Sequence, residues 1–173
     1  MNRTLKYPTF GAIMIICQIL LDEYINIWPL VYIAIFPPFI ILLPPSMNRS
    51  LYMLTAFSFG ICIDLLSDGV MGLNAAALTA MAYIRPFVLK FTLPKGNLDN
   101  YENIPLTPHT VEIPALILIT AILISVFFTV YILMDSAASF TLGYTVLKML
   151  VCITANTLLS ILLNLALLDK IFR

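Results

Sequence analysis

The sequence is short of charge, and the charge that it has is balanced. Only 10% of its 173 residues are Asp, Glu, Lys or Arg, and the formal net charge is zero. Soluble domains carry about 25% charged residues, so this chain has too little polar surface to solvate a globule. The neutral charge also argues against nucleic acid as a partner, because nucleic-acid binding depends on clustered Lys and Arg.

Residues that carry chemistry are equally scarce. The three cysteines are far apart and form no C-x-x-C pair, so we expect each to be a small buried apolar residue outside any disulfide or zinc site. The single histidine, His109, lies in a polar loop among prolines. The chain contains no Gly-x-Ser-x-Gly, no His-Glu-x-x-His and no glycine-rich phosphate loop. We therefore expect no enzyme activity, no catalytic residues, no metal and no cofactor.

Long apolar segments make up most of the chain. Hydrophobic residues account for 61% of it, and the mean hydropathy is +1.02. A bilayer core of roughly 30 Å needs about 20 apolar residues per helix, so the length allows about six spans. The sequence predicts an all-α membrane protein, a single six-transmembrane-helix bundle without a soluble domain. The expected spans are residues 7–21, 30–43, 51–66, 71–90, 113–134 and 142–168, with a hydrophilic loop at 91–112.

The second expected span contains a break. Pro37 and Pro38 each remove a backbone donor and clash with the preceding helical turn. Segment 30–43 is therefore expected to be kinked, broken or only partly spanning.

Basic residues are unevenly distributed between the expected loops. With a cytoplasmic N-terminus, the outer turns contain Asp22, Glu23, Asp68 and Asp135 and no Lys or Arg. The inner side receives seven of the nine basic residues, namely Arg3, Lys6, Arg49, Lys90, Lys95, Lys170 and Arg173. The positive-inside rule then predicts that both termini are cytoplasmic, an N-in/C-in topology.

Small residues recur at intervals of four on two neighbouring spans. They are Ala56, Gly60, Gly72, Ala76 and Ala80. A spacing of four keeps side chains on roughly one helical face, and such smooth faces pack closely in lipid. We expect the hairpin of spans 51–66 and 71–90 to be the core of the fold and to supply a helix-packing or partner interface.

Several polar side chains are expected at membrane depth. They are Asp64, Asn74, Arg85, Lys148, Asn156 and Asn164. A charge at the bilayer centre costs about 2.5 to 3.5 kcal/mol on insertion scales, so such groups usually face the bundle interior and find partners. Arg85 and Asn74 share a helical face, and we expect Arg85 to extend to the inner headgroups beside Lys90.

Asp64 has further interpretations. Asp64 and Lys148 lie at similar outer depth, which predicts an ion pair between them, either structural or at a proton site, a cation site or a gate. Alternatively, Asp64 lies near enough to the interface to be hydrated. Asp64 and Asp68 are four residues apart and could share a metal ion, but Asp68 precedes Gly69, which is typical of a turn.

The last expected span carries a polar residue at every fourth position. These residues are Lys148, Cys152, Asn156, Ser160 and Asn164. Each step of four overshoots a full turn by about 40°, so the side chains form a seam that winds partway round the helix. The seam is interpreted either as a helix–helix face, with hydrogen bonds worth about 0.6 to 2 kcal/mol each, or as the lining of a ligand cavity.

One stretch resembles a known family. The segments AFSFGICIDLL (56–66), GLNAAA (72–77) and AYIRPFVLK (82–90) closely resemble the rod-shape-determining protein MreD family, especially its Bacteroidetes forms. The close match covers about residues 50 to 95, and residues 100 to 173 match in character only. Family members commonly have His at the position of Asn74.

The resemblance implies a small multi-pass protein of the bacterial inner membrane. It would be a non-enzymatic scaffold of the cell-elongation machinery that works with the single-span protein MreC. Through MreC it would act with the MreB filament and with a penicillin-binding transpeptidase and its glycosyltransferase partner, controlling cell shape and peptidoglycan synthesis. The resemblance also implies a fold similar to the S components of energy-coupling-factor transporters, which provides the alternative function of a vitamin-binding transporter subunit.

Overall fold

The computed structural model shows an all-α protein. It describes residues 3–24, 31–44, 47–67, 70–93, 106, 111–136 and 141–168, and these residues form no sheet. The helices are α1 (Arg3–Tyr24), α2 (Pro37–Leu42), α3 (Arg49–Leu66), α4 (Leu73–Thr92), α5 (Ile113–Asp135) and α6 (Leu142–Leu163). A π-helical turn, η3 (Asn164–Leu168), continues α6. The predicted all-α class is confirmed.

Three helices of the described part are long and apolar enough to cross a membrane. They are α3, α5, and α6 together with the start of η3, as far as Ala166. Because more than one helix meets this criterion, the structure indicates a multi-pass membrane protein. Helices α1 and α4 have 22 and 20 residues, which at 1.5 Å per residue is also about the thickness of a bilayer core.

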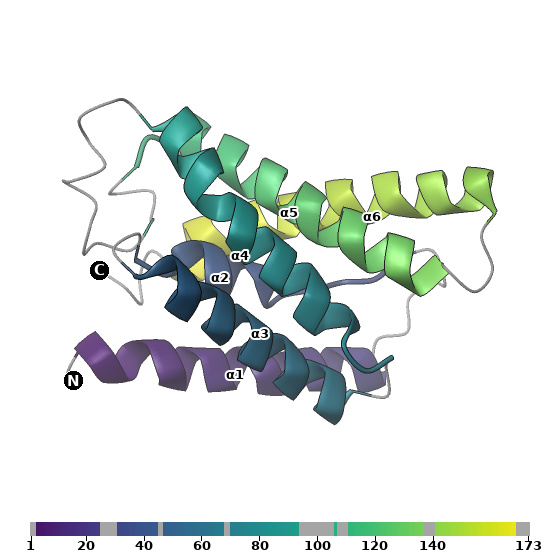
Figure 1. Ribbon diagram of the computed structural model, residues 1–173, viewed down its shortest axis with the longest axis horizontal. Helices are drawn as coiled ribbons and strands as arrows, with labels where there is room; N and C mark the ends of the chain where they lie inside the picture. Colours follow the sequence, from purple (N-terminus) through teal and green to yellow (C-terminus); the bar gives the residue numbers. More distant parts are fainter. Residues whose placement is uncertain are drawn as a thin grey trace.

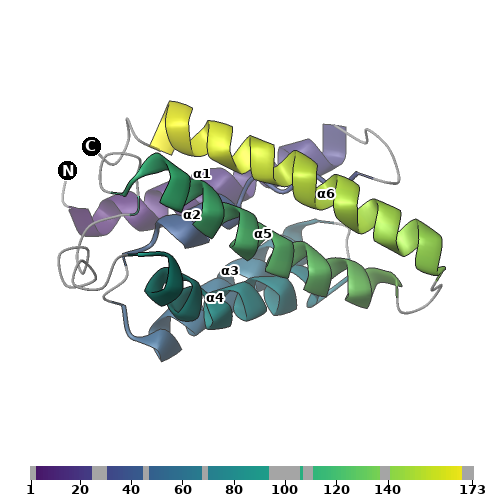
Figure 2. The ribbon, with the colours of Figure 1, turned by 90° about the horizontal axis from the view of Figure 1, so that it is seen from above.

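Successive elements run back and forth along the long axis of the molecule (Figure 1). The start of α1, the end of α4 and the end of α6 lie at one end, and the starts of α4 and α6 lie at the other. The view from above shows the same order (Figure 2). The start of the first helix, α1, and the end of the last helix, α6, therefore lie on the same side of the bundle.

The second expected span is broken, as predicted. Residues 31–36 form no helix, and α2 begins only at Pro37 and has six residues. Two prolines fit the first turn of a helix because the N–H groups there have no intrahelical acceptor. Six extended residues cover at most about 20 Å and six helical residues about 9 Å, so the segment has roughly the reach of a bilayer core.

This broken segment, residues 31–43, lies at the centre of the fold. Every residue of α2 is buried, and so are Ala34 and Phe36. Helix α2 contacts α4, α5 and α6. In the irregular part, residues 31–36, Ala34 and Phe36 are buried and the other four residues are half-buried, so this backbone lies mostly against protein, which is where such backbone is tolerated at membrane depth.

Helices α3 and α4 form the hairpin predicted from the small residues, with backbone contact at Gly60. A Cβ atom at Gly60 would lie 2.4 Å from Cα and 2.6 Å from N of Ala75. Ala56, one turn earlier, is fully buried. The closest approach to Gly60 on α4 is thus at Ala75, next to the predicted Ala76, and Ala76 and Ala80 are half-buried.

Candidate functional site

The candidate site is the set of polar side chains inside the bundle. Asp64 is the first of them, and its carboxylate binds backbone groups of a neighbouring helix. Asp64 lies in the last turn of α3, is 4% exposed, and faces the start of α4. Its carboxylate accepts hydrogen bonds from the backbone N–H groups of Gly72, Asn74 and Ala75 at 3.0, 3.0 and 3.1 Å. The Asn74 side-chain amide donates a fourth at 2.9 Å.

Asp64 is therefore an N-terminal cap supplied from a neighbouring helix. The first N–H groups of a helix have no intrahelical partner and attract negative charge. Gly72 precedes α4 with φ of 89°, in the left-handed region that glycine tolerates, and has no side chain to act as a cap. The four hydrogen bonds compensate for the burial of the carboxylate and join the two helices of the hairpin.

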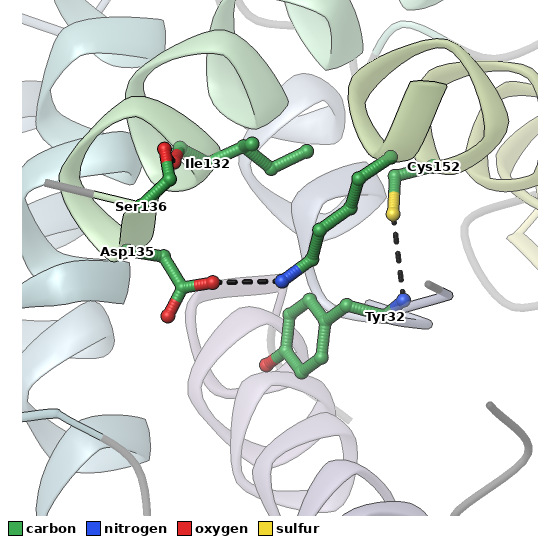
Figure 3. Close-up of polar contacts among 6 residues, drawn as sticks. Tyr32, Ile132, Asp135, Ser136 and Cys152 are labelled. Atoms are coloured by element: carbon green, nitrogen blue, oxygen red, sulfur yellow. Dashed lines mark hydrogen bonds and ion pairs between the residues drawn. The ribbon is translucent and has the colours of Figure 1, made fainter. Parts of the chain in front are cut away.

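The predicted ion pair between Asp64 and Lys148 is wrong. Lys148 instead pairs with Asp135 at 2.7 Å, across the connection from α5 to α6 (Figure 3). The reason is that α4 already supplies four donors to Asp64, while Asp135 ends α5 within reach of Lys148. Both partners of the observed pair are partly exposed, so the pair contributes at most about 1 kcal/mol.

The structure does not test the interpretation that Asp64 and Asp68 share a metal ion. Asp68 lies outside the described residues, and within them no three His, Cys, Asp or Glu side chains are grouped as metal ligands.

The prediction that Arg85 extends to the inner headgroups beside Lys90 is wrong. It is 4% exposed, and its Nη2 donates to the carbonyl oxygens of Ile41, at 3.0 Å, and Leu43. The guanidinium carbon lies 4.6 Å from the centre of the Tyr52 ring, and the Tyr52 hydroxyl donates to the carbonyl of Ile40. Arg85 turns inward because α2 ends here and its last carbonyls have no helical N–H partner.

The extended residues that precede α2 are supported in the same way by Asn156 of α6. Its Oδ1 accepts the N–H of Ala34 at 2.8 Å, and its Nδ2 donates to the carbonyl of Tyr32 at 2.7 Å. One turn earlier, the Cys152 sulfur accepts the N–H of Tyr32 at 3.4 Å (Figure 3). The middle of the polar seam on α6 therefore bonds to backbone of the broken segment.

Gln18 of α1 completes this support and was missed in the sequence. It is fully buried, donates to the carbonyl of Ile33 at 2.9 Å and accepts the N–H of Ile35 at 2.9 Å. The signal that could have found it is a single amide side chain in an otherwise apolar run. Tyr52 was missed too, because a tyrosine in an apolar helix gives no sign that its hydroxyl is needed elsewhere.

The remaining seam residues make fewer contacts. Asn164 is buried and donates only to the carbonyl of Ser160 in its own helix, at 3.1 Å. Its Oδ1 and the Ser160 hydroxyl have no hydrogen-bond partner within the described residues. The sequence pattern thus predicted where polar groups lie on α6, and the structure divides them into residues that bond across the bundle and residues that do not.

Three comparisons find no match for this chain. Protein-family models, curated proteins and solved structures all return none. The resemblance to the MreD family remains a prediction that rests on residues 50–95.

Proposed function

We propose that this protein is a non-enzymatic scaffold subunit of the bacterial cell-elongation complex. In this proposal six segments, including the broken one, cross the inner membrane with both termini in the cytoplasm. The protein holds an MreC-like single-span partner and through it influences cell shape and peptidoglycan synthesis. The proposal is supported by the internal use of Asp64, Arg85, Gln18 and Asn156, which serve the fold itself.

The observation that carries the proposal is an apolar groove between α1 and α3. Its volume is about 560 Å³, and Phe39 and Leu43 of the broken segment also line it. Small residues contribute from both helices, namely Gly11, Ala12, Thr55 and Ser58. In lipid, small residues let another helix approach closely, so the groove fits the membrane helix of a single-span partner.

The test is co-purification of the MreC-like partner in detergent. Ser58→Phe places a ring in the groove from an exposed position of α3, and we expect it to remove most of the co-purified partner and to round the cells. Thr154→Phe makes a similar change at an exposed position of α6 outside the groove, and should leave the complex intact.

Two results would contradict the proposal. One is equal recovery of the partner with Ser58→Phe and Thr154→Phe. The other is submicromolar binding of a vitamin by the purified protein with no change of cell shape on depletion, which would establish the alternative of a transporter subunit.

A further inference from the structure

A basic and aromatic surface lies at the end of the bundle where α3 begins and α4 ends. It consists of Arg49, the first residue of α3, and of Tyr83, Phe87 and Lys90 of α4. The three residues of α4 are spaced by four and three, which places them on one face of the helix. All four residues are exposed, so the surface is open to the surroundings of the protein.

Arg49 is oriented by the two rings of this surface. The central carbon of its guanidinium lies over the rings of Tyr83 and Phe87, at 4.2 and 5.2 Å from the ring centres. A cation over an aromatic ring is attracted by the quadrupole of the ring. This contact uses no hydrogen bond, and none of the guanidinium N–H groups donates to another described residue. The cation is therefore positioned while its donors stay available.

The other polar groups of the surface are also unused donors. The Lys90 ammonium and the Tyr83 hydroxyl form no ion pair or hydrogen bond with any described residue. Glu112 precedes α5 at the same end of the molecule (Figure 1), and it pairs with neither Lys90 nor Arg49. Two cations without a carboxylate partner in the described part give the surface a positive potential, which attracts an anion.

The position of the surface favours a lipid as the source of this anion. Arg49 begins α3, which is long and apolar enough to cross a bilayer, so its side chain lies where that span reaches the headgroups. Phe87 is 56% exposed, and Phe91, one turn later on α4, is 87% exposed. Exposed rings of this kind are covered by acyl chains in a membrane. A free phosphate ion would meet the donors and leave both rings uncovered.

We propose that this surface binds the headgroup phosphate of an anionic phospholipid. Arg49 and Lys90 contact the phosphate oxygens, and the Tyr83 hydroxyl donates to one of them. Phe87 and Phe91 lie against the acyl chains of the same lipid. Arginine suits this contact because its fork of N–H groups matches two phosphate oxygens.

The headgroup must carry a net negative charge, because a zwitterionic headgroup brings its own cation toward the two basic side chains. This site is independent of the scaffold function, because none of its residues lines the groove between α1 and α3.

The experiment is titration of the purified whole protein in detergent with phosphatidylglycerol, followed by native mass spectrometry. The control lipid is phosphatidylcholine with the same acyl chains, and we expect the first phosphatidylglycerol to bind about tenfold more tightly. Arg49→Gln and Lys90→Gln should each weaken phosphatidylglycerol binding about fivefold and leave phosphatidylcholine binding unchanged. Lys148→Gln removes the same charge near the start of α6, at the other end of the molecule, and should bind phosphatidylglycerol like the unchanged protein.

Tyr83→Leu tests the role of the rings, because it keeps both charges. We expect it to weaken phosphatidylglycerol binding about threefold, since Arg49 loses its cation–π contact. Residues 49, 83 and 90 are exposed, so each variant should unfold close to the temperature of the unchanged protein when no anionic lipid is present. Thermal unfolding in the same detergent thus separates loss of binding from loss of fold.

Three results would overturn the proposal. The first is equal affinity of the unchanged protein for the two lipids. The second is an equal loss of phosphatidylglycerol binding in Lys148→Gln and Arg49→Gln, which would assign the preference to the net charge of the protein. The third is displacement of the lipid by millimolar inorganic phosphate, which would assign the donors to a free anion.

Discussion

At Gly60 the backbones of α3 and α4 touch, and this contact depends on one missing methyl group. We predict that Gly60→Ala lowers the free energy of unfolding by about 1 to 3 kcal/mol, because the new Cβ would overlap backbone atoms of Ala75 that cannot rotate away. The measurement is SDS-induced unfolding of the purified protein in mixed micelles.

Gly143→Ala is the matched control for this contact. Gly143 lies in the first turn of α6, and nothing stands within 4 Å of the position of its Cβ. Its free energy of unfolding should stay the same or rise by up to about 1 kcal/mol, because alanine loses less backbone freedom than glycine on folding. If both variants lost the same free energy of unfolding, the close approach at Gly60 would not be what stabilises the hairpin.

At the scale of elements, the broken segment is the part of the fold with the most unusual requirements. A continuous helix satisfies its own backbone, whereas residues 31–36 and the end of α2 need donors and acceptors from elsewhere. Gln18 of α1, Arg85 of α4 and Asn156 of α6 provide them. The three helices therefore all form hydrogen bonds to the same irregular segment.

We predict that Asn156→Leu destabilises the protein by about 2 to 4 kcal/mol. The substitution leaves the buried Ala34 N–H without its side-chain partner, at about 1 to 3 kcal/mol, and removes the hydrogen bond to the part-buried Tyr32 carbonyl, at about 0.5 to 1.5 kcal/mol. Asn164→Leu, two turns later on the same seam, removes only a bond within its own helix and should change stability by less than about 1 kcal/mol.

Thermal unfolding followed by circular dichroism measures both asparagine variants. If Asn164→Leu proved as damaging as Asn156→Leu, the loss would belong to the polar seam in general and not to the support of residues 32–34.

At the scale of the whole molecule, the alternating direction of the elements sets the topology. The start of α1, the end of α4 and the end of α6 lie together (Figure 1), so in a membrane the N-terminus and the loop after α4 should share one side. By the positive-inside rule, the seven basic residues assigned to that side by sequence predict that it faces the cytoplasm.

We predict that alkaline phosphatase fused near Asn100 is inactive and that the same enzyme fused after Ser136 is active, since it requires export to fold. Green fluorescent protein at the N-terminus should fluoresce in the same cells. Phosphatase activity of the Asn100 fusion would contradict the predicted topology and indicate the opposite orientation.

The hairpin and the class of the protein were predictable because their signals are local. Apolar runs identify helices that satisfy their own backbone, and a spacing of four brings Ala56 and Gly60 to one face without reference to the rest of the chain. Pro37 and Pro38 predict a break for the same reason, since each acts on its own turn.

The partners of the buried polar groups were decided only by the tertiary structure. Asn156 meets Ala34 across 122 residues, and Arg85 meets Ile41 across 44. From charge and depth alone, Asp64 was predicted to pair with Lys148. In the structure its carboxylate instead accepts hydrogen bonds from the unsatisfied N–H groups at the start of α4. Sequence alone determined which segments are helical and where one must break, because those outcomes depend on neighbours in the chain. Which side chain supports the broken backbone depends on distant groups that come together only when the bundle packs.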